Sequence, residues 1–100
     1  MIRASGGFNP AKLSLDFTNT GAVGAVTIDK PSGRVNIAAA GTAITVTNSL
    51  VTASSRVFAV VSTNDSTAIV KNVVPGAGSF VITLNAAATA QTSIDFLVVS

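Results

Sequence analysis

Few side chains in this sequence are suited to catalysis or to metal binding. The chain has no histidine, cysteine or glutamate, so neither a Ser-His-Asp arrangement nor an ordinary zinc site is available. Its carboxylates are Asp16, Asp29, Asp65 and Asp95, each on or beside a different expected strand. Paired acid–base catalysis needs two carboxylates about 5–10 Å apart, and no motif brings two of them together. We therefore expect a protein that is not an enzyme and that binds no cofactor or metal.

Two short motifs have alternative interpretations. Lys12-Leu13-Ser14 is compatible with a Ser–Lys dyad, but the alternation of a strand explains it better. Asn64-Asp65-Ser66 offers loop oxygens of the kind that bind calcium. It is more typical of an Asx-type turn, in which the carboxylate accepts a hydrogen bond from the backbone two residues on. No glycine-rich loop precedes a helix, so a phosphate cradle is not expected either.

Composition favours a surface that other protein covers. Apolar residues make up 48% of the 100 residues and charged residues only 10%, whereas soluble domains have roughly 25% charged residues. Much of the exterior must then consist of Ala, Val, Ser, Thr and Gly, which suits contacts within an assembly. The alternative is a small monomer that its many hydroxyl groups keep soluble.

Other partners are not indicated. The six basic residues are scattered singly, and no Trp or Tyr is present to stack on bases, so we expect no nucleic-acid partner. The five Phe fit a core better. The first residues lack the apolar segment of a secretory signal, and no apolar run approaches 18 residues, so we expect no membrane partner.

Eight short runs predict strands, because they alternate with a period of two or are apolar throughout. Turn residues separate them, with turns predicted at residues 18–21, 30–33 and 75–78, and Leu50 predicted to fold back beneath the sheet. The predicted strands are residues 12–17, 23–29, RVNIAA (34–39), TAITVT (42–47), RVFAVVS (56–62), TAIVKNVV (67–74), SFVITL (79–84) and IDFLVV (94–99).

This pattern predicts an all-β fold: a single antiparallel β-sandwich or small jelly-roll-like barrel of about eight short strands. Residues 57–61 and 94–99 are apolar on both faces. We therefore expect residues 57–61 to be a central strand covered on both sides. One cover is the core, and the second is expected to be another subunit.

The domain is expected to span residues 12–100, with an arm at residues 1–11. Gly6-Gly7 and Pro10 do not suit the interior of a strand or helix. The arm either becomes ordered on contact, with Phe8 as its anchor, or is a frayed terminus. The assembly contacts that we expect are Arg3, Phe8, Phe58, Val60, Leu97 and Val99.

Three stretches resemble a known class of protein. They are SGRVNIAAAGTAITVTNS (32–49), TNDSTAIVKNVVPGAGSFVITL (63–84) and IDFLVV (94–99), with V-T-N-S and T-N-D the most particular pieces. Together they resemble small β-structured virion proteins of tailed bacteriophages and the distal β-domains of tail fibres and spikes. The resemblance covers the last two-thirds of the chain and implies a structural or attachment role in a phage particle, commonly as a homotrimer.

The leading expectation is a capsid decoration (cement) protein, which stabilises the head by binding over subunits of the major capsid protein. It would be located in the virion, assembled in the host cytoplasm. The alternative is a tail fibre or tailspike component, or a receptor-binding domain that recognises a cell-surface glycan. The lack of Trp and Tyr disfavours glycan binding. A depolymerase is a third possibility, which the missing His, Glu and Cys disfavour.

Overall fold

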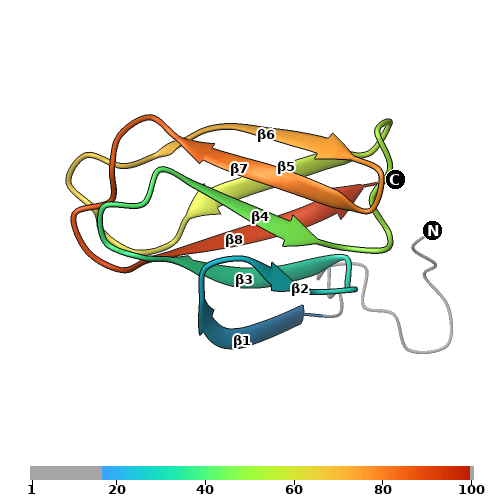
Figure 1. Cartoon of the computed structure of the whole chain (residues 1–100), viewed down its shortest axis with the longest axis horizontal. Helices are drawn as coiled ribbons and strands as arrows, with labels where there is room; N and C mark the ends of the chain where they lie inside the picture. Colours follow the sequence, from blue (N-terminus) through green and yellow to red (C-terminus); the bar gives the residue numbers. More distant parts are fainter. Residues whose placement is uncertain (1–16, 100) are drawn as a thin grey trace, which may run out of the picture.

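A computed structural model of the chain describes residues 17–99, which form eight strands and no helix (Figure 1). The all-β prediction is thus confirmed for these residues. The expected arm and residues 12–16 lie outside them. The strands are β1 (Phe17–Val23), β2 (Val26–Thr27), β3 (Ser32–Ile37), β4 (Ala43–Thr47), β5 (Arg56–Val61), β6 (Val70–Gly76), β7 (Ser79–Leu84) and β8 (Thr92–Val99).

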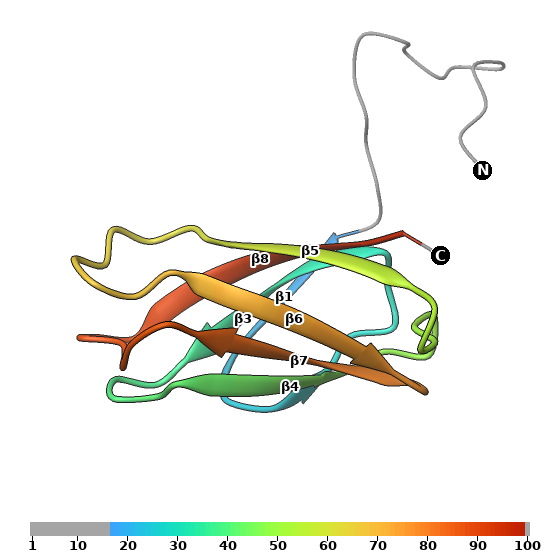
Figure 2. The same cartoon turned by 90° about the horizontal axis from the view of Figure 1, so that it is seen from above.

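The strands form two sheets of four, which lie in two layers when the molecule is viewed from above (Figure 2). Sheet 1 has the order β1-β3-β8-β5, and sheet 2 has the order β2-β4-β7-β6. Both sheets are mixed, because β1 pairs with β3 and β2 pairs with β4 in parallel. The expectation of a purely antiparallel arrangement is therefore wrong. The short early strands alternate between the two sheets, and a strand that returns after such a crossover can run parallel to its neighbour.

One hydrophobic core lies between the sheets. Phe80, Ile82 and Leu84 of β7 are buried, as their period-two pattern predicts. The rings of Phe80 and Phe96 meet edge to face at the centre, with centroids 5.0 Å apart. The buried apolar residues are Ile28, Val35, Ile37, Ile44, Val46, Val51, Ala68, Phe80, Ile82, Leu84, Ala88, Ile94, Phe96 and Val98.

Several turn predictions are wrong in detail. Residues 18–21 belong to β1. The turn predicted at residues 30–33 overlaps β3, which begins at Ser32. The hairpin between β6 and β7 turns through Ala77 and Gly78 alone, with Gly78 at φ +76°, so Pro75 and Gly76 lie in β6. Short polar residues pair as strands here because a neighbouring strand supplies hydrogen bonds that local propensity does not foresee.

Two predictions about burial are also wrong. Leu50 is 43% exposed, and its neighbour Val51 fills the core instead. The strand predicted to be central, β5, lies at the edge of sheet 1, while β8 is central. The outward side chains of β5 are therefore covered by no other part of residues 17–99: Phe58 is 58% exposed and Val60 is 62% exposed. A strand that is apolar on both faces can be an edge strand with one open face.

Replacing Gly33 with alanine is expected to destabilise the fold by about 1–3 kcal/mol. A Cβ atom at Gly33 would lie 2.8 Å from the carbonyl oxygen of Thr18 and 2.9 Å from Cε2 of Phe96, so β1 or the ring must move. Urea unfolding of both proteins measures the loss. Gly76→Ala is the matched control, because its Cβ would meet nothing closer than Ser79 O at 3.8 Å. Equal effects of the two substitutions would contradict the steric argument.

Candidate functional site: an apolar sheet face

The outer face of sheet 1 carries four of the nine large exposed apolar side chains among residues 17–99, including both exposed phenylalanines. Along β5, Val57, Ala59 and Val61 pack against the core, so Phe58 and Val60 point outward. Along β8, Ile94, Phe96 and Val98 are buried, so Leu97 and Val99 point outward. We call the surface formed by Phe17, Phe58, Val60, Leu97 and Val99 the apolar face.

The strand register brings these residues together. Leu97 lies opposite Phe58 on one side and opposite Ser32 on the other, and Ser32 in turn lies opposite Phe17. Residues opposite one another in a sheet project on the same side. Phe17, at 53% exposure, therefore ends a row that runs across the whole sheet to Phe58. Exposed aromatic and aliphatic side chains gathered in this way are typical of an interaction surface.

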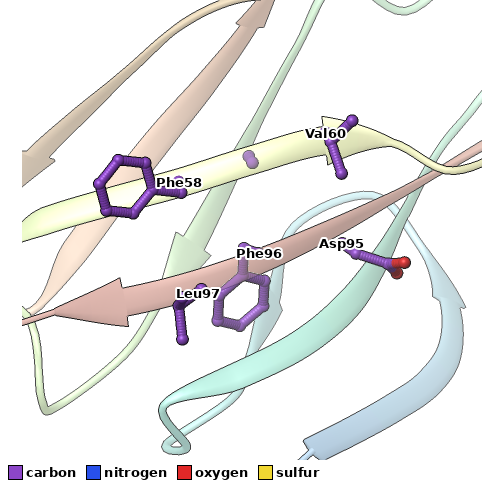
Figure 3. A pocket seen from close by; sticks show the side chains of 6 residues that line it. Phe58, Val60, Asp95, Phe96 and Leu97 are labelled. Atoms are coloured by element: carbon purple, nitrogen blue, oxygen red, sulfur yellow. The ribbon is translucent and has the colours of Figure 1, made fainter. Parts of the chain in front are cut away.

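A shallow depression of about 250 Å³ lies on this face between β5 and β8. Figure 3 shows Phe58 and Val60 on β5 beside Asp95 and Leu97 on the neighbouring strand β8. Its lining is almost entirely apolar, and it is open to solvent. A depression of this kind suits a side chain of a protein partner better than a polar small molecule. The lining residues are Phe58, Ala59, Val60, Asp95, Phe96 and Leu97.

An ion pair crosses the same face. Arg34 and Asp95 are opposite each other on β3 and β8. Nε of Arg34 donates to Oδ1 of Asp95 at 2.6 Å, and Nη2 donates to Oδ2 at 3.1 Å. This two-point geometry is the strong form of the interaction, and the hydrogen bond that Arg34 donates to Asp95 raises the pKa of Arg34 above its ordinary value. The pair holds β3 against β8, and both carboxylate oxygens of Asp95 accept hydrogen bonds from Arg34.

The second sheet offers a different surface. On its outer side, Thr45 of β4 lies opposite Val81, which lies opposite Val74 of β6. The other outward positions on β4 and β7 are Ala43, Thr47, Ser79 and Thr83. Val74 is 59% exposed and Val81 is 36% exposed, but the outward positions of β4, β6 and β7 include no aromatic residue. The exposed phenylalanines therefore distinguish sheet 1 from sheet 2.

Asp65 forms the Asx-type turn that the sequence predicts. Its Oδ1 accepts hydrogen bonds from the backbone N–H of Thr67 at 2.9 Å and of Ala68 at 2.8 Å. Its Oδ2 accepts from the N–H and the hydroxyl of Thr89 at 3.0 and 2.9 Å. The carboxylate thus joins two loops at one end of the domain. Because both oxygens already have protein donors, Asp65 does not have the open oxygens that a calcium site needs.

These hydrogen bonds lower the pKa of Asp65 far below its ordinary value, chiefly through the Ala68 and Thr67 amides. A carboxyl group with a depressed pKa in the folded state stabilises the fold above its unfolded pKa, near 4, and loses this contribution as the pH falls. Asp65→Asn is therefore expected to reduce stability at pH 7, and the difference from the original protein is expected to shrink between about pH 4 and pH 2.

Urea unfolding at a series of pH values tests this expectation. Asp29→Asn is the control, because within residues 17–99 Asp29 accepts a single hydrogen bond, from the amide of Ser49 across an exposed contact. A stability difference for Asp65→Asn that stayed constant from pH 7 to pH 2 would show that the charge of Asp65 does not stabilise the fold.

Asn48 has a comparable role at the opposite end. Its side chain is fully buried, where Nδ2 donates to the carbonyl of Lys30 at 2.8 Å and Oδ1 accepts from the amide of Leu50 at 2.9 Å. The backbone N–H of Asn48 donates to the carbonyl of Gly78. One asparagine therefore links three loops. The V-T-N-S and T-N-D pieces of the sequence therefore have a structural role. Each contains a residue, Asn48 or Asp65, whose hydrogen bonds connect loops.

Of the assembly contacts expected from the sequence, Phe58, Val60, Leu97 and Val99 lie together on the apolar face. Arg3 and Phe8 lie outside the described residues. Sequence reasoning missed Phe17, and its general assignment of Phe residues to the core is wrong for Phe17 and Phe58. The available signal is that Phe17 is followed by Thr18-Asn19-Thr20-Gly21, a stretch with no large apolar residue.

Residues 17–99 contain no cluster of three acidic, His or Cys side chains that would hold a metal ion. Nor does this part of the chain contain a helix long and apolar enough to span a membrane. Compared with known family models, with curated proteins and with solved structures, the chain matches none of them.

Proposed function

We propose that this chain is a structural protein that works by assembly through its apolar face. The observation that carries the proposal is the group of large apolar side chains on the outer face of sheet 1, where Phe17, Phe58 and Val60 are each more than half exposed, in a domain with only 10% charged residues. A patch of this kind on a water-exposed sheet favours association, because burying apolar area stabilises a complex by about 25 cal/mol per Å².

For the architecture, we propose a β-sandwich. The single hydrophobic core between the two sheets supports it.

A structural rather than catalytic role has further support from the carboxylates. Each aspartate among residues 17–99 has a structural partner: Asp29 accepts from Ser49, Asp65 ties two loops, and Asp95 pairs with Arg34. In each case the carboxylate holds strands or loops together. We therefore propose that the protein is not an enzyme.

The more specific proposal is a virion protein of a tailed bacteriophage, and within that class a capsid decoration protein bound over the major capsid protein. It rests on the resemblance of residues 32–49, 63–84 and 94–99 to such proteins. The chain would form a homo-oligomer, as a trimer, through the apolar face, and this oligomer would bind over the shell. The second candidate is a tail fibre or spike component, which the same β-rich segments favour.

Composition of purified particles separates the two candidates. A decoration protein is expected at a copy number near that of the capsid subunit, and its deletion is expected to weaken heads while adsorption continues. A few copies at the tail, with loss of adsorption on deletion, would favour the fibre. Absence from particles altogether would overturn both. Native mass measurement of the purified chain tests self-assembly separately, and a monomer at micromolar concentration would contradict it.

A further inference from the structure

We propose that the outer edge of β5 binds residues 12–16 of a neighbouring copy as an added strand, with Leu13 and Leu15 beside Phe58 and Val60. The inference rests on the proposed self-assembly and names the segment that makes the contact. Its basis is the unequal protection of the sheet edges, the position at which the preceding chain enters sheet 1, and a match in side-chain spacing.

The four edge strands of the described residues differ in how well they resist strand addition. Short length, lysine, proline and bulges are the usual protections of a sheet edge. β2 has only two residues, and β1 has an irregular register between Asn19 and Val23. β6 has a register shift between Val70 and Asn72, and it carries Lys71 and Pro75. Each of these three edges is a poor template for another strand.

β5 lacks these protections. It pairs with β8 in continuous register over six residues, from Arg56 to Val61, with no bulge, lysine or proline. Within residues 17–99 no strand pairs with its other edge. An edge of this length leaves backbone donors and acceptors available for a strand from another chain. The apolar side chains of Phe58 and Val60 stand directly above that edge.

The chain that precedes β1 is suited to fill this position. In the sequence K-L-S-L-D at residues 12–16, Leu13 and Leu15 alternate with Lys12, Ser14 and Asp16. Phe58 and Val60 have the same spacing of two residues. Side chains two apart project on the same face of a strand. Leu13 and Leu15 can therefore form cross-strand pairs with Phe58 and Val60, which bury apolar area at the free edge of β5.

The point of entry favours a neighbouring copy over the same copy. Phe17 lies opposite Ser32, the first residue of β3, so sheet 1 offers residues 12–16 no further partner in this register. Those five residues contain neither glycine nor proline, and the nearest proline is Pro10. An extended run of five residues covers about 16 Å. A strand partner for this segment is therefore to be sought outside its own sheet 1.

Exchange of this segment gives each copy one donor strand and one acceptor edge. Such a contact is heterologous and can close into a ring. The symmetry of a trimer would satisfy it, and every copy would then have its β5 edge covered. The same contact explains how a chain with few charges keeps its most apolar edge away from water.

Engineered cysteines test the contact directly, because the natural chain has no thiol. Full-length Leu15→Cys chains are mixed with full-length Phe58→Cys or Val60→Cys chains and oxidised. Cross-strand neighbours lie about 4.5–5.5 Å apart at Cα, a separation that a disulfide can span. We expect disulfide-linked heterodimers from one or both pairs, at a yield at least about tenfold above the control pair Leu15→Cys with Val74→Cys.

The outcomes separate this inference from the proposed function. Heterodimers above the control, in a protein that native mass spectrometry finds to be oligomeric, support strand exchange. An oligomer in which neither pair forms heterodimers overturns strand exchange and leaves self-assembly intact. A disulfide confined to one chain of the double variant L15C/F58C places the segment on its own copy and also overturns the inference. A monomeric natural chain overturns both proposals.

Discussion

Replacing Phe80 with alanine is expected to lower the free energy of unfolding by about 3–5 kcal/mol. The side chain is fully buried in β7, and its ring packs edge to face on Phe96 at 5.0 Å. Removal of the ring loses apolar burial, leaves a cavity between the two sheets and ends this aromatic contact. A domain of this size has about 5–15 kcal/mol of stability in total. The substitution therefore removes a large part of it.

Phe58→Ala is the matched control, since it removes the same atoms from β5 at a position that is 58% exposed. Its effect on the stability of the isolated domain is expected to stay below about 1 kcal/mol, the range of exposed substitutions. Urea unfolding of both variants, measured at a concentration where the chain is monomeric, gives the comparison. Similar losses of stability for the two variants would show that Phe58 is buried in the folded domain. This result would contradict the apolar face as an exposed surface.

The strands could largely be predicted from the sequence, because burial on one face forces a period of two. Val35 and Ile37 on β3, and Phe80 and Ile82 on β7, follow this rule. The pairing partners could not be predicted in the same way. A strand such as β1, with four polar or glycine residues between Phe17 and Ala22, has little pattern of its own and is held by hydrogen bonds to β3.

Position within the sheet was the main error. Residues 57–61 have apolar side chains on both faces, and such a run is typical of a strand enclosed on both sides. The same composition arises when one face meets the core and the other is left for a partner, as Phe58 and Val60 are. Sequence pattern reports that a face is apolar, but it does not report what covers it. The exposure of Phe58 and Val60 in the folded domain supplies that information for residues 17–99.

The candidate surface could be predicted in part for the same reason. Phe58, Val60, Leu97 and Val99 belong to runs with a visible excess of apolar side chains. Phe17 joins them only through the register of β1 with β3, a contact between segments that no local pattern specifies. The Arg34–Asp95 pair is of this kind as well, because 61 residues separate its members in the sequence.

Substitution of both Phe58 and Val60 by aspartate is expected to weaken self-association by at least about 100-fold, which corresponds to about 2.7 kcal/mol. Each side chain is exposed in the single domain, so the fold itself is expected to remain. In the assembly, the substitutions remove two apolar contacts and require two carboxylates to be buried among Leu97 and Val99, which is costly unless they find partners. The cation Arg34 on this face already has Asp95 as its partner.

Val74→Asp is the control, because Val74 is about as exposed as Phe58 but lies on the outer face of sheet 2. It is expected to leave self-association unchanged. Sedimentation velocity over a range of concentrations measures the association constants, and circular dichroism checks that each variant is folded. Loss of association with Val74→Asp but not with the double variant would place the interface on sheet 2. Equal loss with both would mean that added negative charge, rather than the apolar face, controls assembly.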